Sequence, residues 1–183
     1  VASNKVKGIV EDLKSFAVKG ETAHQKNERL DLNELTKRSL RLVNNQLKNS
    51  TSNVEVNLAN KLPTFYGSGS RIEQVIVNLI LNACQALENK SQKITITTYF
   101  HSKYDSVVLT VEDQGIGINA KDLRKLTDPF YTTKRQSGGT GLGLSVSAGI
   151  VRDHQGQITF KSTLGEGTKA KLSLPLIQKE NEL

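Results

Sequence analysis

The chain has 183 residues, of which 36% are hydrophobic and 23% are charged, with a formal net charge of +7. These are globular values, so we expect one domain with a full core and room for an appendage. They exclude an internal disulfide, because Cys84 is the single cysteine, and we expect neither a membrane span nor a signal peptide. The positive charge is spread thinly, which fits phosphates better than DNA.

A single cysteine is typical of a reducing setting, so we expect a cytoplasmic location and expect Cys84 to belong to the core. The chain contains no methionine and begins at Val1, which favours an excised part of a longer protein, although removal of an initiator residue would look the same. We expect no nucleic-acid partner and no membrane contact by this part, while the parent protein could still be membrane-anchored.

The first stretch, Ser3–Gly20, has apolar residues at three- and four-residue spacing, which predicts an amphipathic helix with a broad apolar stripe. One isolated helix cannot bury such a stripe. We therefore expect partner helices from another chain or from residues beyond this sequence; docking on its own domain is the alternative. Gly20–Arg29 is polar and is interpreted as a linker.

The next elements are a helix and two short extended pieces. Asp31 is a suitable N-cap for a helix over Leu32–Lys48, which has a periodic apolar face. Val54–Leu58 alternates as a strand, and Leu62–Tyr66 is a short extended piece. The turn Gly67–Ser70 is expected to supply a hydroxyl cap for the helix that follows.

Arg71–Glu88 is predicted to form one long helix that is apolar over most of its circumference. Its polar residues fall within an arc of about 80° at 3.6 residues per turn. They are Arg71, Gln74, Asn78, Asn82 and Gln85, called the amide stripe below. The stripe is either a solvated edge with an internal hydrogen-bond network or the lining of a ligand site.

The second half of the chain alternates between strands and helices. Strands are predicted at Lys93–Phe100, Val107–Glu112, Gln157–Ser162 and Thr168–Leu174, and helices at Ala120–Leu126 and Leu144–His154. This order predicts an α+β fold, a two-layer α/β sandwich with a mixed, mostly antiparallel sheet.

Three further clusters could carry chemistry. Asp113–Ile118 places a carboxylate at a strand end before two glycines, which allows a ligand to approach the backbone. Gly138–Ser145 is rich in glycine and leads into a helix, which favours phosphate binding without matching a Walker A or dinucleotide motif. Asp128–Lys134 joins two aromatic residues to a threonine and a lysine. A tight turn and a surface loop are the alternatives for the first and last clusters.

The order and spacing of these clusters resemble the ATP-binding domain of sensor histidine kinases, in the superfamily shared with DNA gyrase, MutL and the ninety-kilodalton heat-shock chaperone. The resemblance covers about Asp31–Leu176 and implies the Bergerat ATP-binding fold. The matching motifs are Asn78–Ala83 (N box), Asp113–Gly117 (G1), Asp128–Lys134 (F), Gly139–Gly143 (G2) and Gly165–Thr168 (last glycine motif). Residues 1–28 are similar to the second helix of the dimerisation and phosphotransfer hairpin plus a linker, which leaves 29–183 as the catalytic domain.

The resemblance implies that the domain binds ATP and Mg²⁺. Asp113 would accept a hydrogen bond from the adenine amino group, and Thr168 would reach the same edge through water. Asn78 and Asn82 would be catalytic residues and metal ligands. The residues that would let the base and ribose lie against the backbone are Gly115, Gly117 and Ile118.

The phosphates would be held by the glycine cluster and the helix that follows it. The implied contacts are Gly139, Thr140, Gly141, Leu142, Gly143 and Leu144. Thr133 and Lys134 would belong to a lid, with Lys134 also catalytic. The implied partners are the protein's own phosphoacceptor hairpin, a homodimer partner and the receiver domain of a response regulator.

Gln74 separates branches of the superfamily, because hydrolysing members have a glutamate four residues before the first Asn. Glutamine cannot act as a base, which favours transfer to a protein histidine over hydrolysis. His24, His101 and His154 do not match the family's acceptor motif, so this chain is not expected to phosphorylate itself. A stand-alone ATPase of the superfamily and a non-catalytic nucleotide-binding module are the alternatives.

Overall fold

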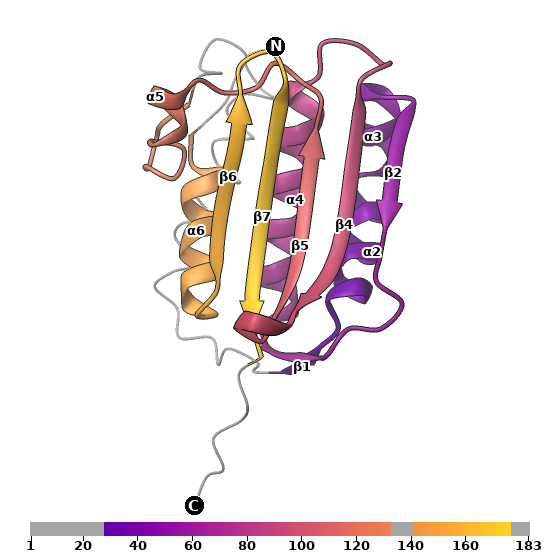
Figure 1. Ribbon diagram of the computed structural model, residues 1–183, viewed down its shortest axis with the longest axis vertical. Helices are drawn as coiled ribbons and strands as arrows, with labels where there is room; N and C mark the ends of the chain where they lie inside the picture. The colour runs from indigo at the N-terminus through magenta and orange to yellow at the C-terminus, as the bar shows by residue number, and fades with distance from the viewer. Residues whose placement is uncertain (1–27, 133–140, 177–183) are drawn as a thin grey trace, which may run out of the picture.

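The computed structural model describes residues 28–132 and 141–176, so the expected N-terminal helix lies outside the described residues. These residues form a five-stranded sheet with the long helices against one of its faces (Figure 1). The sheet has the order β2 (Asn53–Asn57), β4 (Lys93–His101), β5 (Ser106–Asp113), β7 (Gly167–Pro175) and β6 (Gln157–Thr163). Only β2 runs parallel to its neighbour, and the other pairs are antiparallel, which confirms the predicted two-layer α+β fold.

The helical layer consists of α2 (Leu32–Leu42), α3 (Asn44–Ser50), α4 (Gly69–Ala86) and α6 (Gly143–Asp153). Figure 1 shows α4 behind the middle of the sheet, between α6 and the pair α2 and α3. The core between the layers is built from the apolar side of α4, including Ile72, Ile76 and Ile80, and from the inward side chains of the strands. Cys84 is buried here as predicted, and burial raises the pKa of its thiol.

The helix predicted over Leu32–Lys48 is wrong in one respect, because it breaks at Val43 into α2 and α3. Val43 leaves helical geometry, with φ −100° and ψ 9°, and is buried. Val43 and Leu47, four residues apart, are both buried, and the Leu47 N–H still donates to the Val43 carbonyl at 3.0 Å. The apolar periodicity therefore continues across the break.

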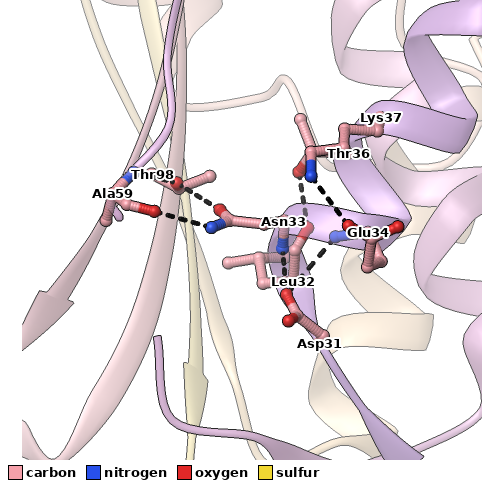
Figure 2. Close-up of polar contacts among 8 residues, drawn as sticks. All are labelled: Asp31, Leu32, Asn33, Glu34, Thr36, Lys37, Ala59 and Thr98. Atoms are coloured by element: carbon pink, nitrogen blue, oxygen red, sulfur yellow. Dashed lines mark hydrogen bonds and ion pairs between the residues drawn. The ribbon is translucent and has the colours of Figure 1, made fainter. Parts of the chain in front are cut away.

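The start of α2 is fixed by polar contacts that Figure 2 draws. The Asp31 carboxylate accepts from the backbone N–H groups of Asn33 at 2.7 Å and Glu34 at 3.3 Å, as predicted for an N-cap. The Asn33 amide donates to the Ala59 carbonyl at 2.8 Å and accepts from Thr98 on β4 at 2.6 Å. One side chain thereby joins the helix to the loop after β2 and to the sheet.

The start of α4 differs from the expected hydroxyl cap. Ser68 occupies the N-cap position, but its side chain makes no capping hydrogen bond. The Nε2 atom of His154 accepts from the Ser68 N–H at 3.0 Å, and the Glu28 carboxylate accepts from the Gly69 N–H at 3.2 Å. Two side chains distant in sequence therefore satisfy the N–H groups of the N-cap residue and of the first helical residue.

The smaller elements complete the fold. β1 (Glu28–Leu30) pairs with β3 (Phe65–Gly67), so the last residues of the expected linker Gly20–Arg29 belong to a strand. A 3-10 turn, η2 (Ser102–Tyr104), joins β4 to β5, and α5 (Ala120–Leu123) is shorter than the predicted Ala120–Leu126. In the described part of the chain, no helix has the length and apolarity that crossing a membrane requires.

Candidate functional site

The amide stripe of α4 faces α6. Asn78 Nδ2 donates to Ser147 Oγ on α6 at 2.9 Å, and Asn82 Nδ2 lies 3.4 Å from Asn78 Oδ1 one turn further along α4. At the other end of the stripe, Arg71 Nη2 forms an ion pair with Asp153 at 2.7 Å. Asn78 and Asn82 are half-buried, whereas Gln74 and Gln85 are exposed. The stripe is therefore only partly covered: Asn78 contacts α6 directly and Asn82 contacts Asn78, while the two glutamines are exposed. The contact between α4 and α6 is called the helix seam below.

The start of α6 lies directly against Asn78. A Cβ atom at Gly143 would approach Asn78 Oδ1 to 2.7 Å, so any other residue here would have to displace the Asn78 amide. Leu142 at the N-cap position is buried, and Leu144 packs against the core. The helix begins one residue before the predicted Leu144. The fold thus brings the end of the second glycine cluster to the amide that the sequence singled out.

Gly141 packs against the segment Phe130–Tyr131. Its φ is +71°, and a Cβ atom there would lie 2.5 Å from the Phe130 carbonyl carbon. Gly141 is therefore needed both for its conformation and for the close approach. Between these positions, the predicted site residues Thr133, Lys134, Gly139 and Thr140 lie outside the described residues.

The carboxylate of Asp113 lies at the end of β5, only 5% exposed, and its Oδ1 accepts from the Gly115 N–H at 2.8 Å. A Cβ atom at Gly115 would lie 2.3 Å from the Ala86 carbonyl oxygen, which places this loop against the end of α4. Gly117 has φ +67° and lies against the Thr163 carbonyl oxygen, which a Cβ atom would approach to 1.9 Å. Both glycines permit close packing against carbonyl groups of the chain itself. The approach of a ligand to this backbone stays a prediction.

Three polar side chains form a row across neighbouring strands. Asp113 on β5 is the register partner of Thr168 on β7, and Thr168 is the register partner of Ser162 on β6. The Ser162 hydroxyl also accepts from the Ile118 N–H at 2.7 Å. The predicted residues Asp113, Thr168 and Ile118 are thus brought together at one end of the sheet.

Sequence reasoning missed Ser147 and Ser162, which contact Asn78 and Thr168 respectively. Ser147 follows Gly143 by four residues, so helical periodicity alone places both on one face and could have indicated it. Ser162 gave no such signal, because its contact with Thr168 depends on strand register.

The segment before the second glycine cluster is tied to α5 by a short hydrogen bond from the Tyr131 hydroxyl to the Asp122 carboxylate. This bond lowers the pKa of Asp122 and raises the pKa of Tyr131. The Asn119 amide donates to the same carboxylate at 2.6 Å. The sequence did not indicate Asp122 as the partner of Tyr131.

The side chains that could bind a metal ion at this site are neutral oxygen donors. Among residues 28–132 and 141–176, no group of three His, Cys, Asp or Glu side chains is placed to hold a metal ion. The oxygens at the middle of the helix seam include the amides of Asn78 and Asn82 and the hydroxyl of Ser147. Amide and phosphate oxygens are suitable ligands for Mg²⁺, which keeps part of its water shell.

A separate hollow of about 540 Å³ lies between α3 and the edge strand β2. Its lining is Leu40, Asn44, Leu47, Lys48, Thr51, Ser52, Val54 and Val56. Lys48 is the single ionisable residue among these, so this hollow offers little to a triphosphate, and it contains none of the predicted site residues.

Comparison with known proteins gives concordant matches. The family model described as histidine kinase-, DNA gyrase B- and HSP90-like ATPase matches residues 67–178. The signal transduction histidine-protein kinase AtoS of Escherichia coli is 31% identical over 98% of this chain and 28% of its own length. The chain spans about a quarter of the length of the curated relatives it matches.

Solved structures match the fold. The catalytic domain of histidine kinase ThkA superposes with a TM-score of 0.71 at 29% identity, over 82% of this chain and 95% of that one. A longer ThkA structure, in complex with the response regulator protein TrrA, has a TM-score of 0.78 at 24% identity over 96% of this chain and 49% of that one. At that identity, the second likeness concerns the fold alone.

Proposed function

The chain belongs to the family of histidine kinase-, DNA gyrase B- and HSP90-like ATPases, and we propose that it is the ATP-binding catalytic domain of a sensor histidine kinase. It transfers the γ-phosphoryl group of ATP to a histidine on a hairpin helix of the parent protein, for relay to an aspartate of a response regulator. The observation that carries the proposal is the contact between Asn78 and the start of α6, which joins an amide oxygen to a helix N-terminus.

The adenine end of the proposed site is the row of side chains on the sheet. When ionised, the buried Asp113 carboxylate accepts hydrogen bonds and cannot donate them. It therefore suits the amino group of adenine and disfavours the carbonyl of guanine. Thr168 is its neighbour on β7, positioned to act on the same edge through water. Gly115, Gly117 and Ile118 supply backbone against which the base and ribose lie.

The phosphate end of the proposed site is the seam between α4 and α6. Asn78 and Asn82 hold Mg²⁺ through amide oxygens, and Gly141, Leu142, Gly143 and Leu144 hold the phosphates at the N-terminus of α6. When bound, the metal ion neutralises charge on the phosphate oxygens. Thr133, Lys134, Gly139 and Thr140 complete the proposed set as predictions from the sequence.

A histidine acceptor needs little activation, because neutral imidazole already carries a lone pair near neutral pH. The domain's own residues then have to align the reactants and screen charge. Gln74, exposed on α4, cannot remove a proton from water, which is consistent with transfer to a protein and not with hydrolysis. The proposed reaction also places the domain in the cytoplasm, beside its homodimer partner hairpin and a receiver domain.

Phosphotransfer in trans tests this function. The chain is mixed with Mg·ATP and a separate hairpin fragment that carries the histidine, and acid-labile, alkali-stable phosphate on the fragment is measured. We expect transfer by the native chain, loss with Asn78→Ala and no change with Asn57→Ala, which alters an exposed amide on the edge strand. No labelled hairpin would refute the proposal, and steady phosphate release without the hairpin would indicate a hydrolysing member.

A further inference from the structure

The hydroxyl of Ser162 is surrounded by three hydrogen-bond partners. It lies 2.7 Å from the Ile118 nitrogen, 2.8 Å from the Gly167 carbonyl oxygen and 2.9 Å from Thr168 Oγ1. These partners come from the loop after β5 and from the start of β7, while Ser162 itself is on β6. One small side chain therefore joins three segments at the head of the sheet.

The protons in this group can be assigned from the chemistry of the partners. A hydroxyl has one proton to donate and two lone pairs. The Gly167 carbonyl can only accept, so it takes the Ser162 proton, and the Ile118 N–H can only donate. The remaining lone pair of Ser162 faces Thr168, so Thr168 is the donor in the 2.9 Å contact between the two hydroxyls.

The proton of Thr168 is thereby committed to Ser162, and the Thr168 oxygen offers only lone pairs to a ligand. Its register partner Asp113 also offers only lone pairs when ionised. Asp113 at the end of β5 and Thr168 at the start of β7 thus present hydrogen-bond acceptors on the same face of the sheet. At position 6 of a purine, such a pair favours an amino group, which donates, and disfavours a carbonyl, which accepts.

We propose that Ser162 is a specificity-determining positioning residue, which holds the Thr168 hydroxyl as an acceptor and so makes the site select a 6-amino purine over a 6-oxo purine. The proposal rests on the proposed function, because it concerns the base of the nucleotide. Ser162 does not touch the base; it acts through the orientation of Thr168. Removing the Ser162 hydroxyl takes away the acceptor of the Thr168 hydroxyl. The Thr168 O–H can then rotate and donate to a ligand carbonyl, directly or through water.

The test compares ATP with inosine triphosphate, which has a carbonyl in place of the 6-amino group. Dissociation constants of both nucleotides with Mg²⁺ are measured by calorimetry for the whole chain and for Ser162→Ala. We expect the native chain to prefer ATP, and Ser162→Ala to lose about tenfold of that preference, the usual scale for one misoriented hydrogen-bonding group. The matched control is Ser173→Ala. Ser173 lies on β7, at the end of the β6–β7 pair opposite to Ser162, and we expect an unchanged preference there.

Thr168→Val supplies an independent arm, because it removes the hydroxyl without changing Ser162. The preference of the Thr168→Val variant for ATP over inosine triphosphate should fall as well. The double variant with Ser162→Ala should show no further fall, since both changes act through the Thr168 hydroxyl. Circular dichroism checks that each variant is folded. A native preference that Ser162→Ala leaves intact would overturn the inference while leaving the proposed function standing, as would additive losses in the double variant. No binding of either nucleotide by the native chain would overturn both.

Discussion

A Cβ atom on Gly143 would lie 2.7 Å from Asn78 Oδ1, so the first residue of α6 leaves no room for a side chain beside the amide. The same amide donates to Ser147 one turn further along α6. Two residues of α6, Gly143 and Ser147, therefore fix the position of the Asn78 side chain. A substitution at either residue should displace that side chain on α4.

Replacing Gly143 with alanine should weaken nucleotide binding without unfolding the domain. The added methyl group pushes the Asn78 amide away from Ser147, and we expect a rise of about tenfold or more in the dissociation constant for Mg·ATP, equivalent to the loss of one charge-assisted contact. Gly143 is the first residue of α6, where the helix-interior preference for alanine does not apply, so the steric contact should also lower the free energy of unfolding slightly. Calorimetry and urea unfolding measure the two effects, and an unaltered affinity would show that Asn78 does not hold the ligand.

Asp113→Asn should reduce ATP affinity by about tenfold or more, because an amide nitrogen then faces the donor edge of the base. The fold should persist, since an asparagine oxygen can still accept from the Gly115 N–H. The matched control is Asp105→Asn at the other end of the sheet, where φ is 44° and asparagine is well tolerated. Equal affinities for the two variants would remove Asp113 from the proposed site.

The hydrogen bond from Tyr131 to Asp122 should persist across the neutral range and fail at both extremes of pH. The pKa of Asp122 is lowered, chiefly by this bond, so its contribution is present above the ordinary carboxyl range and is lost as pH falls through the lowered value. The pKa of Tyr131 is raised, chiefly by the same bond, so its contribution is lost as pH rises through the raised value. A carboxyl NMR titration should show the pKa of Asp122 rising in Tyr131→Phe and unchanged in Tyr104→Phe. An unmoved pKa in Tyr131→Phe would contradict the assignment.

His154 should stabilise the domain through one particular ring nitrogen. Nδ1 lies 2.7 Å from the Ile150 carbonyl, which can only accept, so Nδ1 carries the proton and Nε2 accepts from the Ser68 N–H. His154→Gln can keep the acceptor, whereas His154→Asn keeps only the donor. We expect the asparagine variant to be less stable than the glutamine variant by about 1 kcal/mol in urea unfolding. Equal stabilities would mean that the bond to Ser68 contributes nothing.

Patterns confined to one segment were predictable from the sequence. The apolar circumference of α4, the alternation of β4 and β5, and the Asp31 cap each depend on residues close together in the chain. The three-residue strand β1 was not recognised, because so short a segment carries too little alternation. The extended piece expected at Leu62–Tyr66 covers only part of β3.

Features that depend on distant segments were not predictable. The hydrogen bond from the Ser68 N–H to His154, at the start of α4, spans 86 residues of sequence. The row from Asp113 through Thr168 to Ser162 depends on two strand registers, and a slip of one residue would turn those side chains to the other face. Motif spacing identified members of this row without indicating that Ser162 joins them.

The buried thiol of Cys84 makes the domain its own reporter of local opening. It is the single cysteine of the chain, it packs in the core on α4, and burial keeps it in the unreactive protonated form. Because Cys84 is 7% exposed, an alkylating reagent should label it slowly in the folded domain and faster when α4 separates from its neighbours. The rate of Cys84 alkylation therefore reports local opening of the core in the native sequence, without an engineered probe.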